Sequence, residues 1–220
     1  MNLDIDLAVL DIAATTVEQH EVAHRALCEA VGSDDVTAWM GADEHEAVRG
    51  LLGDPDDGTV ARVHADFRRR LADAYAAEPP EPFPGATQTL ALLRENGVKV
   101  ALTTGFDREI AGVLLADPAW DEGVIDAVVC ADEVPAGRPA PYMIFRAMER
   151  TGVCDVARVL VAGDTVLDLQ AGANAGAGFV VALLSGGAAP EMLGAHRHTH
   201  MLESVTQLPA ILSVQAYEPA

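Results

Sequence analysis

Positive charge is scarce in this sequence. Its 220 residues include 14 Lys and Arg against 34 Asp and Glu, a formal net charge of −20 at pH 7. Such a charge repels nucleic-acid backbones and anionic membrane surfaces, so neither is expected as a partner. Only one lysine, Lys99, is present. An anionic substrate would need local cations at its binding site to overcome the overall repulsion.

Cysteines and long apolar runs are also few. The three cysteines, Cys28, Cys130 and Cys154, lack the spacing of a zinc site and are too few for a disulfide scaffold, which favours a reducing compartment. The longest apolar runs, such as 179–184, are far shorter than the roughly 20 residues that span a bilayer. The N-terminal residues show no positively charged segment before an apolar one, as a secretory signal would have. We therefore expect a cytoplasmic protein without a membrane span.

Hydrophobic periodicity divides the chain into two kinds of sequence. Half of the residues are hydrophobic, and the length suits one large domain or a domain with an insert. Residues 18–77 carry apolar side chains at helical spacing, interrupted by breakers at 32–35 and 53–58. A proline-rich stretch at 78–85 marks the end of this block. The pattern predicts an all-helical insert over residues 18–83.

The rest of the chain, residues 1–17 and 84–220, alternates short apolar runs with amphipathic segments. The predicted strands are 7–10, 98–102, 124–130, 159–162 and 179–184, and the predicted helices are 87–95, 108–115, 142–151 and 168–175. Strands that alternate with helices form a parallel sheet with helices on both faces. The predicted fold class is therefore α/β. In such sheets, ligands bind beyond the carboxyl ends of the strands.

Polar residues follow the predicted strands at that edge. In chain order they are Asp11, Thr103, Thr104, Arg138, Asp164 and Asp168. Three carboxylates brought together repel one another unless a cation lies among them, and hard oxygen ligands favour Mg²⁺. A divalent ion would also make this acidic edge attractive to phosphate. The residues alone thus predict a magnesium and phosphate site.

Four segments of the chain carry a family resemblance. They read DIAATTV from Asp11, LTTGF from Leu102, AGRPAP from Ala136 and AGDTVLD from Ala162. In this order they resemble the four motifs of the haloacid dehalogenase superfamily, and the chain is similar to its phosphonatase-like branch. The resemblance implies a Rossmann-like parallel sheet core over 1–17 and 84–220, with an inserted all-helical cap domain over 18–83. It also implies a hydrolase that uses Mg²⁺.

The resemblance assigns chemical roles to these positions. Asp11 would be the nucleophile that attacks phosphorus, giving an aspartyl phosphate that water cleaves. The Asp11 carboxylate, the backbone carbonyl of Ala13 and Asp164 would hold Mg²⁺, with Asp168 orienting metal-bound water. Thr103 would donate a hydrogen bond to a phosphoryl oxygen.

The resemblance also implies a cation and a set of substrate contacts. Arg138 stands where most of the superfamily has lysine, and it would balance the charges of Asp11 and the phosphoryl group. A guanidinium is always charged and can make two parallel hydrogen bonds, so it suits that task. The substrate contacts would be Thr15, Met40, Glu44, His45, Thr104 and Gly105.

Each of these positions also has an ordinary structural explanation. An aspartate after a strand often caps the next helix, and threonines there often form turns. Arg138 before a proline would by itself be an exposed loop residue. The order of all four groups along the chain favours the site over these explanations. The alternating His196, His198 and His200 are interpreted as a surface or edge segment.

Two departures from the family pattern narrow the function. Most phosphatases of the superfamily carry an aspartate two residues after the nucleophile as general acid, and here that position is Ala13, as in the phosphonatase-like branch. That branch activates its substrate as an imine on a cap lysine. Aligning the cap motif at Met40 and Gly41 puts Glu44 at the lysine position, and Lys99 begins the second core strand, far from the site. Hydrolysis of phosphonoacetaldehyde through such an imine is therefore not expected.

The proton for the leaving group must then come from another residue, unless the leaving group departs without it. Glu44 and His45 are the first candidates, and His20 and His24 are further ones. The predicted function is Mg²⁺-dependent hydrolysis of a small phosphorylated or phosphonated metabolite. A general small-molecule phosphomonoesterase and a non-catalytic phospho-ligand binding protein are the alternatives. The substrate, the choice of a P–O or P–C bond and the oligomeric state, including a homodimer, are left open.

Overall fold

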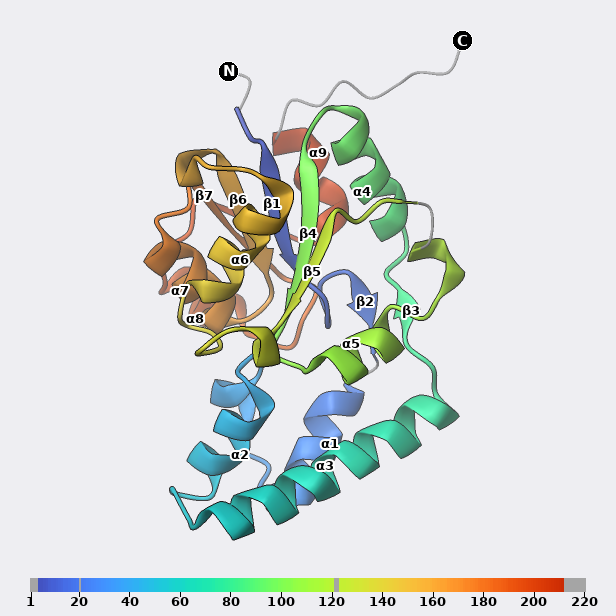
Figure 1. Ribbon diagram of the computed structural model, residues 1–220, viewed down its shortest axis with the longest axis vertical. Coiled ribbons are helices and arrows are strands. Elements are labelled where there is room, and N and C mark those ends of the chain that lie inside the picture. The colour runs from blue at the N-terminus through green and yellow to red at the C-terminus, as the bar shows by residue number, and fades with distance from the viewer. Residues whose placement is uncertain (1–3, 20, 121–122, 212–220) are drawn as a thin grey trace.

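The computed structural model describes residues 4–19, 21–120 and 123–211, and its strands form a six-stranded sheet and a two-stranded ribbon (Figure 1). In the larger sheet all neighbouring strands are parallel, in the order β5-β4-β1-β6-β7-β8. The bounds are β1 Leu7–Asp11, β4 Lys99–Thr104, β5 Ala127–Cys130, β6 Val159–Gly163, β7 Phe179–Leu183 and β8 His200–Leu202. The predicted α/β fold with a parallel sheet is confirmed.

The strand order changes direction at β1. The chain passes from β1 to β4 and β5 on one side, and then returns to β6, β7 and β8 on the other side. In open parallel sheets the crevice beside such a switch is where ligands bind. The carboxyl end of β1, at Asp11, therefore lies where the topology places a ligand.

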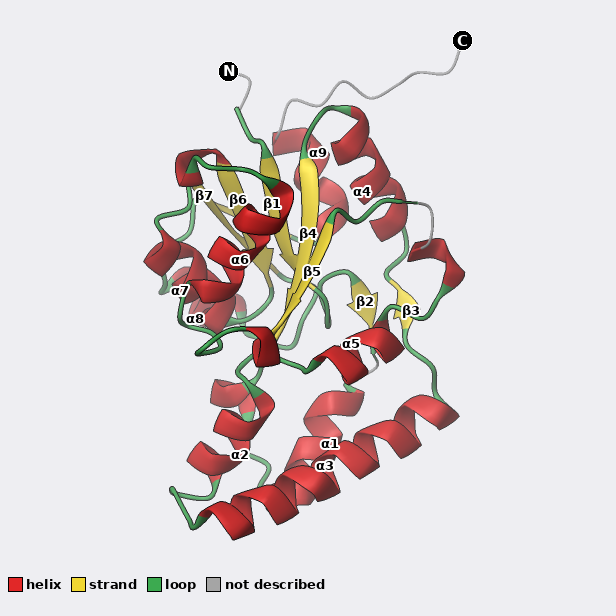
Figure 2. Ribbon diagram, viewed as in Figure 1, coloured by secondary structure: helices red, strands yellow, loops and turns green. Residues whose placement is uncertain are grey.

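Helices cover both faces of the sheet, because successive strand side chains point to opposite faces (Figure 2). Ala8 and Leu10 belong to one buried apolar cluster, together with residues of α4 and α9. Leu7 and Val9 belong to a second cluster, together with residues of α6, α7 and α8. These helices are α4 Ala86–Glu95, α6 Tyr142–Thr151, α7 Val166–Ala175, α8 Pro190–Gly194 and α9 Leu208–Ile211, and α5 is Arg108–Leu114.

A separate group of helices lies beyond the carboxyl ends of the strands (Figure 1). These cap helices are α1 Val22–Val31, α2 Glu44–Leu51 and α3 Asp57–Ala77, and a 3-10 turn spans Thr37–Trp39. The apolar faces of α1 and α2 pack on α3, as the helical spacing predicts. In the described part of the chain, no helix has both the length and the hydropathy to cross a bilayer.

Both ends of the cap helices are joined by a ribbon that the sequence does not predict. Strand β2, Val17–Glu18, pairs antiparallel with β3, Glu81–Pro82. The Phe83 amide also donates to the Thr16 carbonyl at 2.9 Å. Two-residue strands give no alternating pattern, so their pairing has no sequence signal. The domain limits at 17/18 and 83/84 fall within this ribbon or beside it, and they stay a prediction.

The strand ends differ slightly from the predicted ones. Thr103 and Thr104 are the last residues of β4, paired with Asp11 and Cys130, and do not follow the strand. Strand β5 begins at Ala127, three residues later than predicted. The short edge strand β8, which contains His200, is absent from the prediction because three residues carry too little periodicity.

Glu133 ties the segment after β5 to two helices. Its carboxylate accepts hydrogen bonds from Arg108 Nη2 at 2.7 Å, Arg150 Nη2 at 3.1 Å and the Cys130 amide at 2.8 Å. Partial burial alone would raise the pKa of Glu133, but the hydrogen bonds from Arg150 and Arg108 outweigh it and lower the pKa to about 2. The folded state therefore favours the ionised carboxylate.

Glu133→Gln is expected to lower the free energy of unfolding by about 1–2 kcal/mol at pH 7. Because the pKa in the folded state lies below the ordinary value, this stabilisation is complete above about pH 5 and is lost as the pH falls toward about 2. Urea unfolding of both proteins at pH 7 and at pH 3.5 measures the difference in their free energy of unfolding, which should be smaller at pH 3.5. Glu149→Gln, in the exposed pair with Arg146, is the control and should cost less than about 0.5 kcal/mol. An unchanged difference at the two pH values would contradict the assignment.

Candidate functional site

Parallel pairing brings the polar residues of three strands together. The register places Asp11 beside Thr103 of β4 and Leu10 beside Ala162 of β6, and Asp164 comes directly after β6. Asp11, Thr103 and Asp164 therefore lie at the sheet edge that faces the cap helices (Figure 2). The predicted convergence of these side chains is a consequence of the register.

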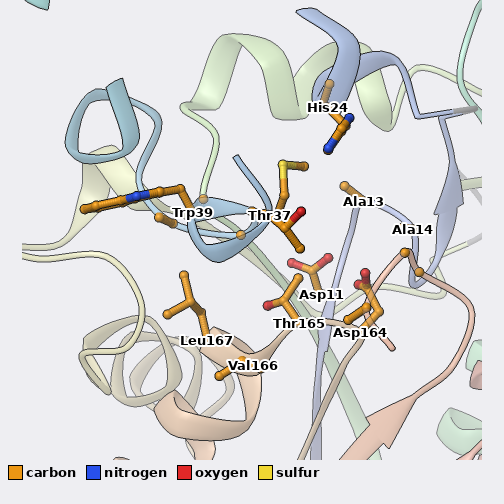
Figure 3. Close-up of a pocket in the computed structure, with 18 of the residues that line it drawn as sticks. Asp11, Ala13, Ala14, His24, Thr37, Trp39, Asp164, Thr165, Val166 and Leu167 are labelled. Carbon is orange, nitrogen blue, oxygen red and sulfur yellow. The ribbon is translucent and has the colours of Figure 1, made fainter. Parts of the chain in front are cut away.

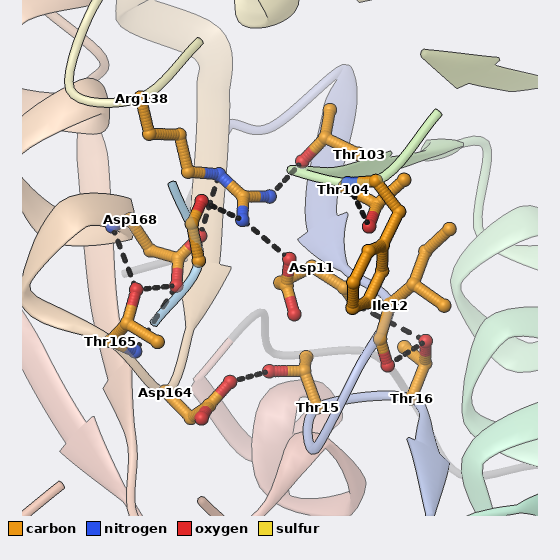
Figure 4. Close-up of polar contacts among 12 residues, drawn as sticks. Asp11, Ile12, Thr15, Thr16, Thr103, Thr104, Arg138, Asp164, Thr165 and Asp168 are labelled. Carbon is orange, nitrogen blue, oxygen red and sulfur yellow. Dashed lines mark hydrogen bonds and ion pairs between the residues drawn. The ribbon is translucent and has the colours of Figure 1, made fainter. Parts of the chain in front are cut away.

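Arg138 lies at the centre of the polar cluster (Figure 4). Its guanidinium contacts Asp11 Oδ1 through Nη1 at 2.7 Å and Asp168 Oδ1 through Nε at 2.9 Å. Its Nη2 donates to Thr103 Oγ1 at 2.8 Å. The side chain is 3% exposed, so these contacts are shielded from water. Arg138 is thus a buried cation in contact with two carboxylates.

Asp168 has two tasks, one for each oxygen. Oδ1 pairs with Arg138, and Oδ2 accepts hydrogen bonds from the Thr165 hydroxyl at 2.6 Å and the Thr165 amide at 3.1 Å. Thr165 in turn caps α7 by accepting from the Asp168 amide, which forms a reciprocal capping box. This arrangement fixes the Asp168 carboxylate and, through it, the guanidinium.

Burial makes the charges of Asp11 and Asp164 costly. Burial is the main cause that raises the pKa of Asp164 to about 7, Asp168 raises it further, and the 2.9 Å hydrogen bond from the Thr15 hydroxyl only partly offsets this. Burial also raises the pKa of Asp11 well above its ordinary value; Arg138 opposes this shift, and Asp168 and Asp164 add to it. Three buried carboxylates therefore face one buried guanidinium, and a divalent cation would balance the excess negative charge.

The available donor atoms fit magnesium. Asp11 and Asp164 supply carboxylate oxygens, and Ala13 lies on the wall of the same cavity. Among the residues that the structure describes, no three His, Cys, Asp or Glu side chains are grouped to hold a metal ion. A site with two carboxylates and a backbone carbonyl leaves positions for water and for substrate oxygens, as Mg²⁺ prefers.

Gly186 makes room for the Asp164 carboxylate. A Cβ atom at Gly186 would lie 1.8 Å from Asp164 Oδ2, closer than any real contact. Next to it, the Ser185 hydroxyl donates to the Ala14 carbonyl at 2.7 Å and so holds the loop after β1. This segment follows β7, and sequence reasoning missed it although the strand-end rule that located the other groups applies there as well.

A cavity of about 730 Å³ lies between the cluster and the cap helices. Figure 3 shows Asp11 and Asp164 on its core side and His24 and Trp39 on the side of the cap helices. Among the predicted substrate contacts, Met40, Glu44, Thr104 and Gly105 line this cavity.

Gly105 of the core lies very close to the segment before α2. A Cβ atom there would lie 2.1 Å from the Ala42 carbonyl oxygen, so only glycine permits this approach. Arg138 Nη1 reaches the Gly41 carbonyl oxygen at 3.4 Å on the same side. The segment before α2 thus lies directly on the polar cluster.

Two predicted substrate contacts lie elsewhere. Thr15 is fully buried and its hydroxyl donates to Asp164, so it positions a carboxylate and does not line the cavity. His45 is exposed, with its ring packed edge-on against His64 at 5.6 Å between centroids. It lies outside the cavity because it follows Glu44 on α2, and adjacent helical residues point in different directions.

The structure also changes which residues are candidates for the general acid. Glu44 is buried, and its oxygens contact His64 Nε2 at 2.9 Å and the Asp107 amide at 3.2 Å. His24, on α1, lines the cavity opposite Asp11 (Figure 3). His196, which is partly exposed and lies shortly before the edge strand β8, also lines it. His20 lies outside the described residues.

The chain is similar in sequence to curated proteins that are named phosphonoacetaldehyde hydrolase. A phosphonoacetaldehyde hydrolase of Parabacteroides distasonis is 35% identical over 116 residues, which are 53% of this chain and 44% of that protein. One of Bacillus cereus is 34% identical over 138 residues, 61% of this chain and 50% of that protein. The matches therefore span about half the length of these curated relatives.

Solved structures show the same fold at lower identity. A hydrolase from Pseudomonas syringae has a TM-score of 0.83 at 21% identity, over 96% of this chain and 99% of the other. A phosphonoacetaldehyde hydrolase-like protein from Oleispira antarctica also has a TM-score of 0.83, at 19% identity, over 96% and 92%. A family model described as haloacid dehalogenase-like hydrolase matches residues 5–176. This chain belongs to the haloacid dehalogenase-like hydrolase family.

Proposed function

We propose that the chain is a magnesium-dependent hydrolase that transfers the phosphoryl group of a small phosphate ester or phosphonate to Asp11 and then to water. The observation that carries the proposal is the buried cluster of Asp11, Arg138, Asp164 and Asp168 at the floor of a cavity under the cap helices. A non-catalytic binding protein would have no need for a buried carboxylate at the position where a phosphate would bind.

The residues of the chain divide the work. Bound Mg²⁺ would neutralise phosphate charge beside Asp11 and Asp164, so that two anions can approach each other. Arg138 favours the ionised form of Asp11 against the effect of burial and holds its Oδ1. The Thr103 oxygen accepts from Arg138, so the hydroxyl proton can be donated to a phosphoryl oxygen. Phosphoryl transfer depends mainly on such positioning and charge stabilisation.

The position of Lys99 supports a direct route over an imine. Lys99 is the first residue of β4 and pairs with Leu7, while Thr103, four residues on, pairs with Asp11. At about 3.3 Å per residue, its backbone is roughly 13 Å from the site along the strand. The chain has no other lysine, so no side-chain amine can form an imine with a substrate in the cavity. This favours a phosphate ester over phosphonoacetaldehyde and keeps a general phosphomonoesterase as the second candidate.

Removal of divalent cations is the first test of the proposal. We expect dialysis against EDTA to lower the release of p-nitrophenol from p-nitrophenyl phosphate by at least about 10²-fold, because Asp11 and the phosphate would repel each other without the cation. Added MgCl₂ should restore the rate, and a mock-dialysed sample is the control. Binding of phosphate with no metal-dependent turnover of any phosphate or phosphonate would instead favour the binding protein.

The second test concerns the proton for the leaving group. The geometry favours His24 over Glu44, because both Glu44 oxygens are already engaged. We expect His24→Asn to slow the hydrolysis of an alkyl phosphate by about 10²-fold or more, and that of p-nitrophenyl phosphate much less, because nitrophenolate leaves without a proton. Glu44→Gln tests the other candidate.

His45→Asn is the matched control for this series, since His45 is exposed and lies outside the cavity. It should change both rates little and equally. Equal losses on both substrates for His24→Asn would reject an acid role for His24.

A cytoplasmic location and a homodimer stay predictions from the sequence.

A further inference from the structure

The cavity is larger and more apolar than a phosphate group requires. Its volume of about 730 Å³ falls in the range of sites for drug-sized ligands. The larger apolar side chains that line it come from four separate parts of the chain. They are Leu27 of α1, Trp39 and Met40 before α2, Phe67 of α3 and Phe106 after β4.

Two of these side chains are almost completely buried. Leu27 is 5% exposed and Phe67 is 2% exposed, so they form a fixed surface. Trp39 is held against α2, because a Cβ atom at Gly50 would lie 2.0 Å from the indole ring. The aromatic and aliphatic wall is therefore set by the packing of the cap helices.

The charges on the wall disfavour a second anionic group on the substrate. Among the described residues that line the cavity, Arg138 is the one Lys or Arg, and its guanidinium is already bound by Asp11 and Asp168. Glu18, Glu21 and Glu44 line the same space. A carboxylate on the leaving group would meet these acids without a basic partner other than an imidazole, at a cost in desolvation.

We propose that the substrate is the phosphate monoester of a mainly apolar alcohol of medium size that carries no anionic group. This inference rests on the proposed function. The bond between phosphorus and the ester oxygen breaks, a bond between phosphorus and an Asp11 oxygen forms, and the ester oxygen takes a proton to leave as the alcohol. Water then attacks the phosphorus of the aspartyl phosphate, which releases inorganic phosphate and restores the Asp11 carboxylate.

A series of matched esters tests the proposal. At pH 8 with Mg²⁺, kcat/KM is measured for hexyl phosphate and for the phosphate ester of 6-hydroxyhexanoate. We expect hexyl phosphate to exceed the carboxylate ester by about tenfold or more. Lengthening the chain from butyl to hexyl should raise kcat/KM about two- to fourfold per methylene.

The outcomes separate this inference from the proposed function. If p-nitrophenyl phosphate is hydrolysed but the carboxylate ester matches hexyl phosphate, this inference is rejected and the proposed hydrolase function stands. If no phosphate ester is turned over, p-nitrophenyl phosphate included, the proposed function fails and this inference fails with it.

Two variants test whether the preference for an apolar alcohol arises at the cavity wall. Trp39→Ala should raise KM for hexyl phosphate about five- to tenfold while shifting the inhibition constant of inorganic phosphate by a smaller factor. Ala38→Lys, at an exposed position on the wall, should raise kcat/KM for the carboxylate ester about threefold or more relative to hexyl phosphate. An equal change for the two esters would overturn the electrostatic part of the inference.

Discussion

Replacing Asp11 with asparagine is expected to lower phosphate release by at least about 10⁴-fold. A carboxamide is a poor nucleophile, so no covalent phosphoenzyme can form. The fold should be retained, because the change removes one of three mutually repelling buried carboxylates and Arg138 keeps its contact with Asp168. The free energy of unfolding should therefore be equal to that of the native protein or higher.

The measurement combines kinetics with a chemical trap. Single-turnover rates on p-nitrophenyl phosphate give the loss of activity, and acid quenching of a reaction with ³²P-labelled substrate shows whether the protein carries the label. Native protein should be labelled and Asp11→Asn should not. Urea unfolding of both proteins excludes a loss through misfolding. Activity above about 1% of native in the variant, or label retained by it, would reject Asp11 as the nucleophile.

Arg138 is the second position where a large effect is expected, on stability as well as on turnover. Arg138→Met leaves Asp11 and Asp168 buried without their common cation, and breaking a buried charge pair costs about 3–5 kcal/mol. Loss of the guanidinium should also lower kcat by about 10³-fold, since it removes charge stabilisation at the nucleophile. Urea unfolding and kcat on p-nitrophenyl phosphate measure the two effects.

Arg138→Lys separates charge from geometry. Lysine keeps the positive charge, but a single ammonium cannot reproduce the three contacts to Asp11, Asp168 and Thr103. We expect it to recover most of the stability and to lose about 10- to 10²-fold in kcat. Arg146→Met, on the exposed side of α6, controls for the loss of an arginine as such. If Arg138→Met proved as stable and as active as Arg146→Met, the Arg138 guanidinium would contribute neither to stability nor to turnover, and the prediction would be wrong.

The convergence of the polar cluster could be predicted because it follows from rules that act along the chain. Apolar runs identify the strands, alternation with helices makes the sheet parallel, and parallel strands bring their carboxyl ends to one edge. Asp11, Thr103 and Asp164 meet for this reason. The capping box at Thr165 and Asp168 is likewise local, since it spans one helical turn.

Other features depend on contacts between distant segments, and the sequence alone did not show them. Thr15 turns toward Asp164 because the loop after β1 folds back at Ala14, whose φ is 59°. His24 faces the cavity and His45 faces solvent because of how α1 and α2 pack on α3, which no spacing within either helix encodes. The loop at 185–187 reaches the site through the position of β7 in the sheet.

The ribbon of β2 and β3 has a consequence for how this architecture can change over time. Its pairing holds the two ends of the 62 residues between Glu18 and Glu81 side by side, at the spacing of neighbouring strands, about 4.8 Å. For the strands of the larger sheet, these 62 residues are therefore equivalent to the turn of a hairpin. The path from β1 to β4 is then the same whatever that turn contains, so substitutions, insertions or exchange of the helices can alter the part of the cavity wall that they form while the core residues around Arg138 keep their places at the strand ends.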